Sequence, residues 1–126
     1  MLKPGISFTS RTEVTASETA RSLGSGDMDV LATPAMAALM ENAAMKCAAP
    51  HLDAEQTTVG SLIRVTHLRP TLPGDTVSAT ATLTAAEGRK LSFAVEARDS
   101  KGEIGRGEHI RYIVDRARFL AKAKEE

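Results

Sequence analysis

The sequence is poor in aromatic residues and has no excess of either charge. Its 126 residues include three Phe, one Tyr and no Trp, and 16 Lys and Arg balance 16 Asp and Glu. A phosphate backbone requires a basic surface, and single-stranded nucleic acid requires aromatic platforms on which its bases stack. The composition therefore predicts a protein that does not bind nucleic acid.

Cysteine and long apolar runs are also scarce. Cys47 is the only cysteine, so no internal disulfide can form, and its Ala- and Met-rich surroundings favour a small buried hydrophobe over a nucleophile. No run of 18 apolar residues and no signal-peptide pattern occurs, which predicts a soluble cytoplasmic protein without a membrane segment. The three histidines lack metal-ligand spacing, so neither a metal nor a cofactor is expected.

One segment, from Thr33 to about Pro50, has the pattern of a helix. Thr33 is interpreted as its cap, and Pro34 suits the first helical position. The apolar residues that recur at helical spacing on one face are Met36, Leu39, Met40, Ala43, Ala44 and Cys47. The remaining surface is nearly as apolar, so we expect other structure to enclose the helix.

The other segments alternate between apolar and polar residues, as strands do. We expect one strand at about 6–14 and four meandering strands at 57–70, 76–88, 89–99 and 103–114. Val59, Ile63, Val65 and His67 are predicted to share one face of the second strand. Residues 22–29 are interpreted as a mobile loop, and 115–126 as a short helix or frayed end. The pattern predicts one α+β domain over residues 1–126, with a sheet wrapped around a helix.

Three polar side chains, Thr33, Glu41 and His67, lie in apolar settings. If the apolar face of the sheet packs on the helix, the three side chains are able to meet. Each also has a purely structural interpretation: a helix cap, an exposed carboxylate and a core histidine satisfied by the backbone. The residues alone leave both interpretations open.

Four stretches carry a resemblance to a known family. They are VLATPAMAALMENAA, GSLIRVTHLRPTLPGDTVSATATL, EGRKLSFAVEARD and EIGRGEHIR. Together they resemble the hot-dog-fold acyl-CoA thioesterases of the fluoroacetyl-CoA thioesterase-like family, from about Ile6 to Phe119. The resemblance implies a hot-dog fold, with an antiparallel sheet around one long central helix. The spacing of Thr33, Glu41 and His67 matches the family's catalytic Thr, Glu and His.

Further roles follow only from this resemblance. It places the backbone N–H of Gly60 near the thioester and Arg111 near the coenzyme A portion of the substrate. Arg64 and Arg69 are additional candidates for contacts with the coenzyme A phosphates. The resemblance also implies a homodimer with active sites shared across the interface, with a tetramer as the alternative assembly.

The predicted activity is hydrolysis of a small acyl-CoA to free acid and coenzyme A. Glu41 would act either as a nucleophile or as a general base that positions water. Two alternatives are a non-catalytic acyl-CoA-binding or regulatory domain and an enoyl-CoA hydratase, although the Asp/His motif of the hydratases is missing. The family's lid phenylalanines are also missing, since residues 24–28 read GSGDM. We therefore expect thioester chemistry without selectivity for a fluorinated acyl group.

Overall fold

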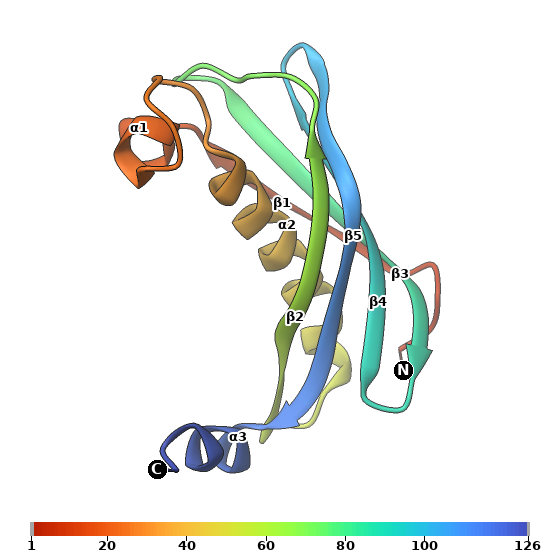
Figure 1. Cartoon of the computed structure of the whole chain (residues 1–126). Coiled ribbons are helices and arrows are strands. Elements are labelled where there is room, and N and C mark those ends of the chain that lie inside the picture. The colour runs from red at the N-terminus through yellow and green to blue at the C-terminus, as the bar shows by residue number, and fades with distance from the viewer. Residues whose placement is uncertain (1, 126) are drawn as a thin grey trace.

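A computed structural model describes residues 2–125 and shows a curled sheet that holds one long helix against its concave face (Figure 1). The sheet contains β1 (Ser7–Glu13), β2 (Gln56–His67), β3 (Thr76–Glu87), β4 (Lys90–Asp99) and β5 (Gly102–Asp115). The helices are α1 (Ala20–Leu23), α2 (Thr33–Ala48) and α3 (Arg116–Ala123), with short 3₁₀ turns at Ala16–Glu18 and Ala49–His51. The predicted α+β hot-dog arrangement is confirmed.

The order of the strands differs from the expected four-strand meander. All pairings are antiparallel and the order is β1-β3-β4-β5-β2, so β2 pairs with β5 and lies at an edge. The segment after His67 crosses toward the opposite edge of the sheet, where β3 begins beside β1. There the Val14 N–H donates to the Asp75 carbonyl. Alternation predicts which face a residue occupies but not which strand is its neighbour, so the sequence pattern missed this crossing.

The core lies between α2 and the inner face of the sheet. Every residue of the predicted helix face is buried except Leu39, which is partly buried and packs against the same cluster. From the sheet, the buried partners are Val77, Ala79, Ala81, Leu83, Leu91, Phe93, Val95 and Ala97. Cys47 is a buried free thiol, and burial raises its pKa, so its prediction as a small core residue is confirmed.

The opposite side of α2 is not covered by this chain. Ala38 and Met45 are exposed, although the sequence predicted a helix enclosed on nearly all sides. The sheet covers only one face of the helix, as Figure 1 shows. An apolar helix surface of this kind is expected to be covered by a further protein surface.

A β-bulge in β2 contradicts the prediction that Val59 and Ile63 share one face of the strand. Val59 pairs with the exposed Tyr112, whereas Ile63 pairs with the buried His109, and the register shifts within 60–62. The extra residue of a bulge reverses the alternation of side chains beyond it. Val59 and Ile63 therefore lie on opposite faces of the sheet.

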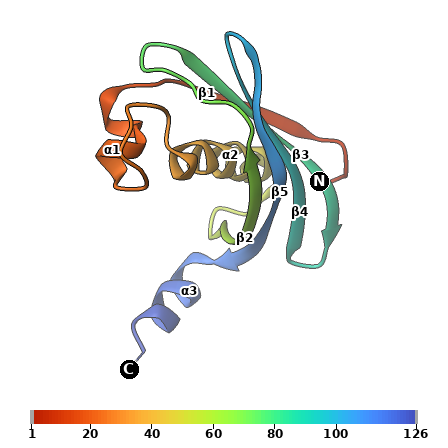
Figure 2. The ribbon, with the colours of Figure 1, turned by 45° about the horizontal axis from the view of Figure 1, so that its top comes forward.

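Two short helices, α1 and α3, lie outside the sheet. Figure 2 shows α1 near the N-terminal end of α2, and α3 extending away from the opposite end of the sheet. The predicted tail helix is confirmed as α3, whose first turn is capped by Asp115. The segment after α1 is exposed and begins at Gly24, which adopts a left-handed φ of 74°. Within residues 2–125, no helix has the length and apolar character needed to span a membrane.

Candidate active site

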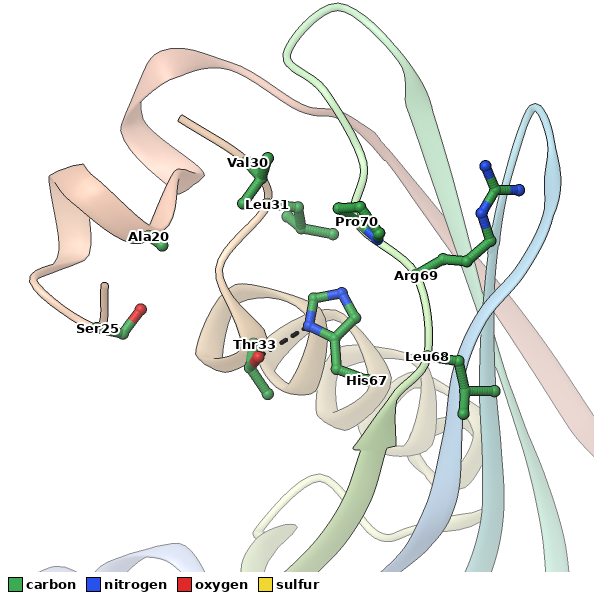
Figure 3. A pocket seen from close by; sticks show the side chains of 9 residues that line it. All are labelled: Ala20, Ser25, Val30, Leu31, Thr33, His67, Leu68, Arg69 and Pro70. Atoms are coloured by element: carbon green, nitrogen blue, oxygen red, sulfur yellow. Dashed lines mark hydrogen bonds between the residues drawn. The ribbon is translucent and has the colours of Figure 1, made fainter. Parts of the chain in front are cut away.

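The first part of the site joins the start of α2 to the end of β2. Thr33 Oγ1 and His67 Nδ1 lie 2.8 Å apart, within hydrogen-bond distance (Figure 3). Thr33 is the first residue of the helix, and the cap position belongs to Ala32, which makes no side-chain capping bond. The interpretation of Thr33 as the cap was wrong, because its hydroxyl bonds to His67 instead of to the helix backbone.

His67 has one nitrogen left without a partner. Its Nε2 is buried and is the one buried side-chain nitrogen or oxygen in residues 2–125 that makes no hydrogen bond. Burial lowers the pKa of the His67 imidazole. The backbone of Arg69 opposes this lowering, although it makes no hydrogen bond to Nε2. Burial therefore favours the neutral form of the ring, and a buried polar atom without a partner is a common feature of functional sites.

A surface cavity of about 340 Å³ opens beside this pair. Its apolar lining is formed by Ala20, Val30, Leu31, Leu68 and Pro70, and Figure 3 shows Val30, Leu31 and Pro70 above the Thr33–His67 pair. Ser25, from the exposed segment after α1, also lines the cavity. The cavity thus combines an apolar wall with a hydroxyl and an imidazole.

The second part of the site lies further along α2, around Glu41. A Cβ placed on Gly60 would lie 3.0 Å from Glu41 Oε2 and 3.4 Å from Arg111 Nη1, so the carboxylate and the guanidinium both approach the same stretch of backbone. Glu41 is half-buried and its charge opposes the lowering of the pKa of Arg111 that burial causes. The carboxylate, the glycine and the arginine form one cluster.

Arg111 occupies an interior position. Its side chain is only 7% exposed; Nε donates to Thr58 Oγ1 at 2.8 Å and Nη2 donates to the Thr58 carbonyl at 2.9 Å. The assignment of this residue to the coenzyme A portion of the substrate stays a prediction; in this structure its guanidinium and the Glu41 carboxylate both lie near Gly60. Sequence reasoning also missed Thr58, whose inward position depends on the bulge in β2, and His109, which faces inward on β5 opposite Phe93.

The two parts of the site are well separated within one chain. Thr33 and Glu41 are eight residues apart, which is about 12 Å along a helix. Gly60 and His67 are seven residues apart on β2, which is roughly 20 Å along an extended strand. One chain therefore presents a Thr–His pair and a Glu–Gly–Arg cluster at different places.

The other two candidate arginines, Arg64 and Arg69, are exposed, and Arg69 also lines the cavity beside Thr33 and His67. Arg64 forms an ion pair with Glu108 across the β2–β5 pairing, and Arg69 Nη1 donates to the Lys101 carbonyl. Among residues 2–125, no three His, Cys, Asp or Glu side chains are grouped so that they would hold a metal ion.

Comparison with known proteins assigns the chain to a family. The sequence model of the fluoroacetyl-CoA-specific thioesterases matches residues 14–117. The fluoroacetyl-CoA thioesterase of Streptantibioticus cattleyicolor is 42% identical over 98 residues, which cover 78% of this chain and 70% of that protein. This chain belongs to the fluoroacetyl-CoA-specific thioesterase family.

Solved structures agree with this assignment. A variant of the fluoroacetyl-CoA thioesterase FlK, solved in complex with acetyl-CoA, superposes with a TM-score of 0.93 at 36% identity, covering 98% of this chain and 97% of that one. A thioesterase-superfamily protein from Thermus thermophilus superposes with a TM-score of 0.91 at 30% identity, covering 98% of this chain and 92% of that one. The predicted family and the predicted thioester hydrolase class are confirmed.

The Glu–Gly–Arg cluster yields a prediction about Gly60. Gly60→Ala would place a methyl group 3.0 Å from Glu41 Oε2 and 3.1 Å from His109 Cε1, tighter than ordinary contacts. We expect kcat for acyl-CoA hydrolysis to fall by about tenfold or more, since small displacements of reacting groups have large kinetic effects. Ser61→Ala, at an exposed position in the same bulge, is the control and is expected to keep its kcat. Unchanged turnover in Gly60→Ala would show that this close approach has no role in the reaction.

Proposed function

We propose that the protein hydrolyses the thioester of a small acyl-CoA, with Glu41, Thr33 and His67 as the catalytic set and Gly60 as the oxyanion donor. The observation that carries the proposal is His67 itself: its Nδ1 bonds to Thr33 and its buried Nε2 has no partner, beside an apolar cavity. Membership in a thioesterase family supports the reaction class. The acetyl-CoA complex of the FlK variant supports a short acyl group.

The reaction needs a group that attacks the carbonyl and donors that stabilise the resulting oxyanion. Glu41 either attacks the thioester carbonyl to give a mixed anhydride or removes a proton from the attacking water. The Gly60 N–H donates to the oxyanion, and the Arg111 guanidinium lies beside the same stretch of backbone as the Glu41 carboxylate. If a mixed anhydride forms, water then hydrolyses it. In both routes the proton that the water loses passes to the imidazole of His67, which Thr33 orients, and from there to the departing coenzyme A sulfur. The products are the free acid and the coenzyme A thiol.

The distance between the two parts of the site leads us to propose a homodimer that completes it. β2 is an edge strand with only β5 as its neighbour, and unpaired edges favour pairing with another chain. Leu62 on this strand and Met45 on α2 are apolar and exposed. A second copy bound at this edge would cover apolar surface that one chain leaves open.

An antiparallel pairing of two β2 strands brings the parts together. In a two-fold symmetric pairing centred between Ile63 and Arg64, Gly60 of one copy lies opposite His67 of the other. Glu41 lies beside Gly60 of the same copy, and Thr33 is hydrogen-bonded to His67 of the same copy. Each dimer then holds two sites, and each site takes Glu41 from one copy and the Thr–His pair from the other.

Spectrophotometric detection of released thiol tests the activity. Acetyl-, propionyl-, isobutyryl- and benzoyl-CoA are offered in parallel, and turnover is expected on at least one of the short substrates. The open segment 24–28 carries no phenylalanine, so fluoroacetyl-CoA is expected to have no advantage over acetyl-CoA. Saturable binding of acyl-CoA without thiol release would favour the non-catalytic binding domain instead. The cytoplasmic location stays a prediction of the sequence.

Mixing of two inactive variants tests the shared site. Glu41→Gln and His67→Ala chains with different tags are co-expressed, and the doubly tagged dimer is isolated. Each isolated hybrid holds one intact site out of two, so it is expected to recover about half of the wild-type activity per chain. Coexpression of the Glu41→Gln chain with a chain that carries both Glu41→Gln and His67→Ala supplies no intact Glu41. This pair is expected to recover no activity. A hybrid as inactive as its parents would place all catalytic groups within one chain.

A further inference from the structure

His109 is a fully buried histidine with no part in the reaction described above. It lies on β5, opposite Ile63 of β2, and its ring is tilted against that of Phe93 with centroids 6.4 Å apart. Both of its nitrogens are bonded: Nδ1 lies 2.7 Å from the Leu62 carbonyl oxygen, and Nε2 lies 3.1 Å from Arg111 Nη1. A buried polar ring with both nitrogens engaged is held in one orientation.

These two bonds fix which nitrogen carries the proton. A carbonyl only accepts, so Nδ1–H donates to Leu62, and the unprotonated Nε2 accepts from the guanidinium, which only donates. Burial, and then the positive charge of Arg111, lower the pKa of His109, whereas the Leu62 bond and Glu41 oppose the shift. The neutral imidazole is the form that fits between Leu62 and Arg111.

The guanidinium of Arg111 is thereby held on three sides. Thr58 accepts from Nε through its hydroxyl and from Nη2 through its carbonyl, and His109 accepts from Nη1. Nη1 carries two hydrogens, and only one of them is used by His109. The other side of Nη1 lies beside Gly60, where Glu41 Oε2 also approaches.

We infer that His109 is a positioning residue for acyl-CoA hydrolysis: it accepts a hydrogen bond from Arg111 and thereby directs the guanidinium toward Glu41 and Gly60. The same ring donates to Leu62, the residue at which the register of β2 shifts. One side chain thus fixes both the arginine and the bulge that presents Gly60. The inference rests on the proposed function, because it assigns His109 a role at that site.

Two isosteric variants separate the two hydrogen bonds. In His109→Asn the amide nitrogen replaces Nδ1, so the donor to Leu62 is kept and the acceptor for Arg111 is lost. In His109→Gln the amide oxygen reaches the place of Nε2, so the acceptor for Arg111 is kept and the donor to Leu62 is lost. Each variant keeps one of two buried hydrogen bonds, so comparable losses of melting temperature are expected.

The kinetic outcome differs between the two variants. His109→Asn is expected to lower kcat by about tenfold to a hundredfold with KM nearly unchanged, as expected when a reacting group is displaced. His109→Gln is expected to stay within about threefold of wild type, because the guanidinium remains oriented. Val77→Ala, a core truncation on β3, is the control that lowers melting temperature without changing kcat per folded molecule.

A second comparison covers the case in which His109→Asn does not fold. Arg111→Lys keeps the charge but loses the planar fork, so it is expected to lower kcat as His109→Asn does, and His109→Gln remains the active member of the series. A kcat in His109→Gln as low as in Arg111→Lys, or a His109→Asn enzyme as fast as wild type, would overturn the inference. Absence of turnover in the wild type itself would overturn the proposed function, and the inference with it.

Discussion

Glu41→Gln is expected to lower kcat for acyl-CoA hydrolysis by about two orders of magnitude or more. The amide has the size and shape of the carboxylate but is neither a nucleophile nor a base, and general catalysis typically contributes 10²–10⁴-fold. The measurement is kcat from thiol release, normalised to the concentration of folded protein. Glu96→Gln, at an exposed position on β4, removes the same charge away from the site and is expected to keep wild-type turnover.

Melting temperatures of the same samples separate a catalytic Glu41 from a structural one. Folding is expected to survive Glu41→Gln, because Arg111 keeps its bonds to Thr58 and His109. A structural role predicts the reverse: a lower melting temperature with nearly unchanged activity per folded molecule. That result would remove Glu41 from the mechanism.

His67→Ala is expected to have a loss of kcat comparable to that of Glu41→Gln. The variant removes the buried Nε2 and leaves the Thr33 hydroxyl without its partner. Groups that act as one unit are non-additive, so the double variant is expected to lose far less than the product of the two single losses. His51→Ala, at an exposed position beyond α2, is the matched histidine control. Losses that multiply in the double variant would show that Glu41 and His67 act independently.

Much of the fold could be predicted from the sequence because its alternation and helical spacing are clear. The inner face of β4, that of β3 as far as Leu83, and the buried face of α2 are those that the periodicity predicted. The position of β2 was not predictable from alternation, because pairing with β5 depends on where the chain crosses after His67. The bulge within 60–62 was missed for a related reason: an extra residue leaves no mark in the apolar pattern until the strand is paired.

The candidate site was predicted in part. The pairing of Thr33 with His67 was expected, although Thr33 was also taken for the helix cap. The assignment of Arg111 to coenzyme A came from the resemblance and stays a prediction, whereas its buried position opposite Gly60 was not predicted. His109 carried no signal on its own, since a single histidine in a strand has no characteristic spacing. Its partners, Leu62 and Arg111, are set by the tertiary structure.

Release of free thiol from acetyl-CoA by the wild-type chain and by Glu41→Gln, measured together at equal concentrations of folded protein, tests the central claim most directly. The claim is that this chain hydrolyses an acyl-CoA thioester with Glu41 as the attacking group or base. It predicts steady turnover by the wild type and a rate at least about a hundredfold lower for the variant. Equal rates for the two proteins would contradict it.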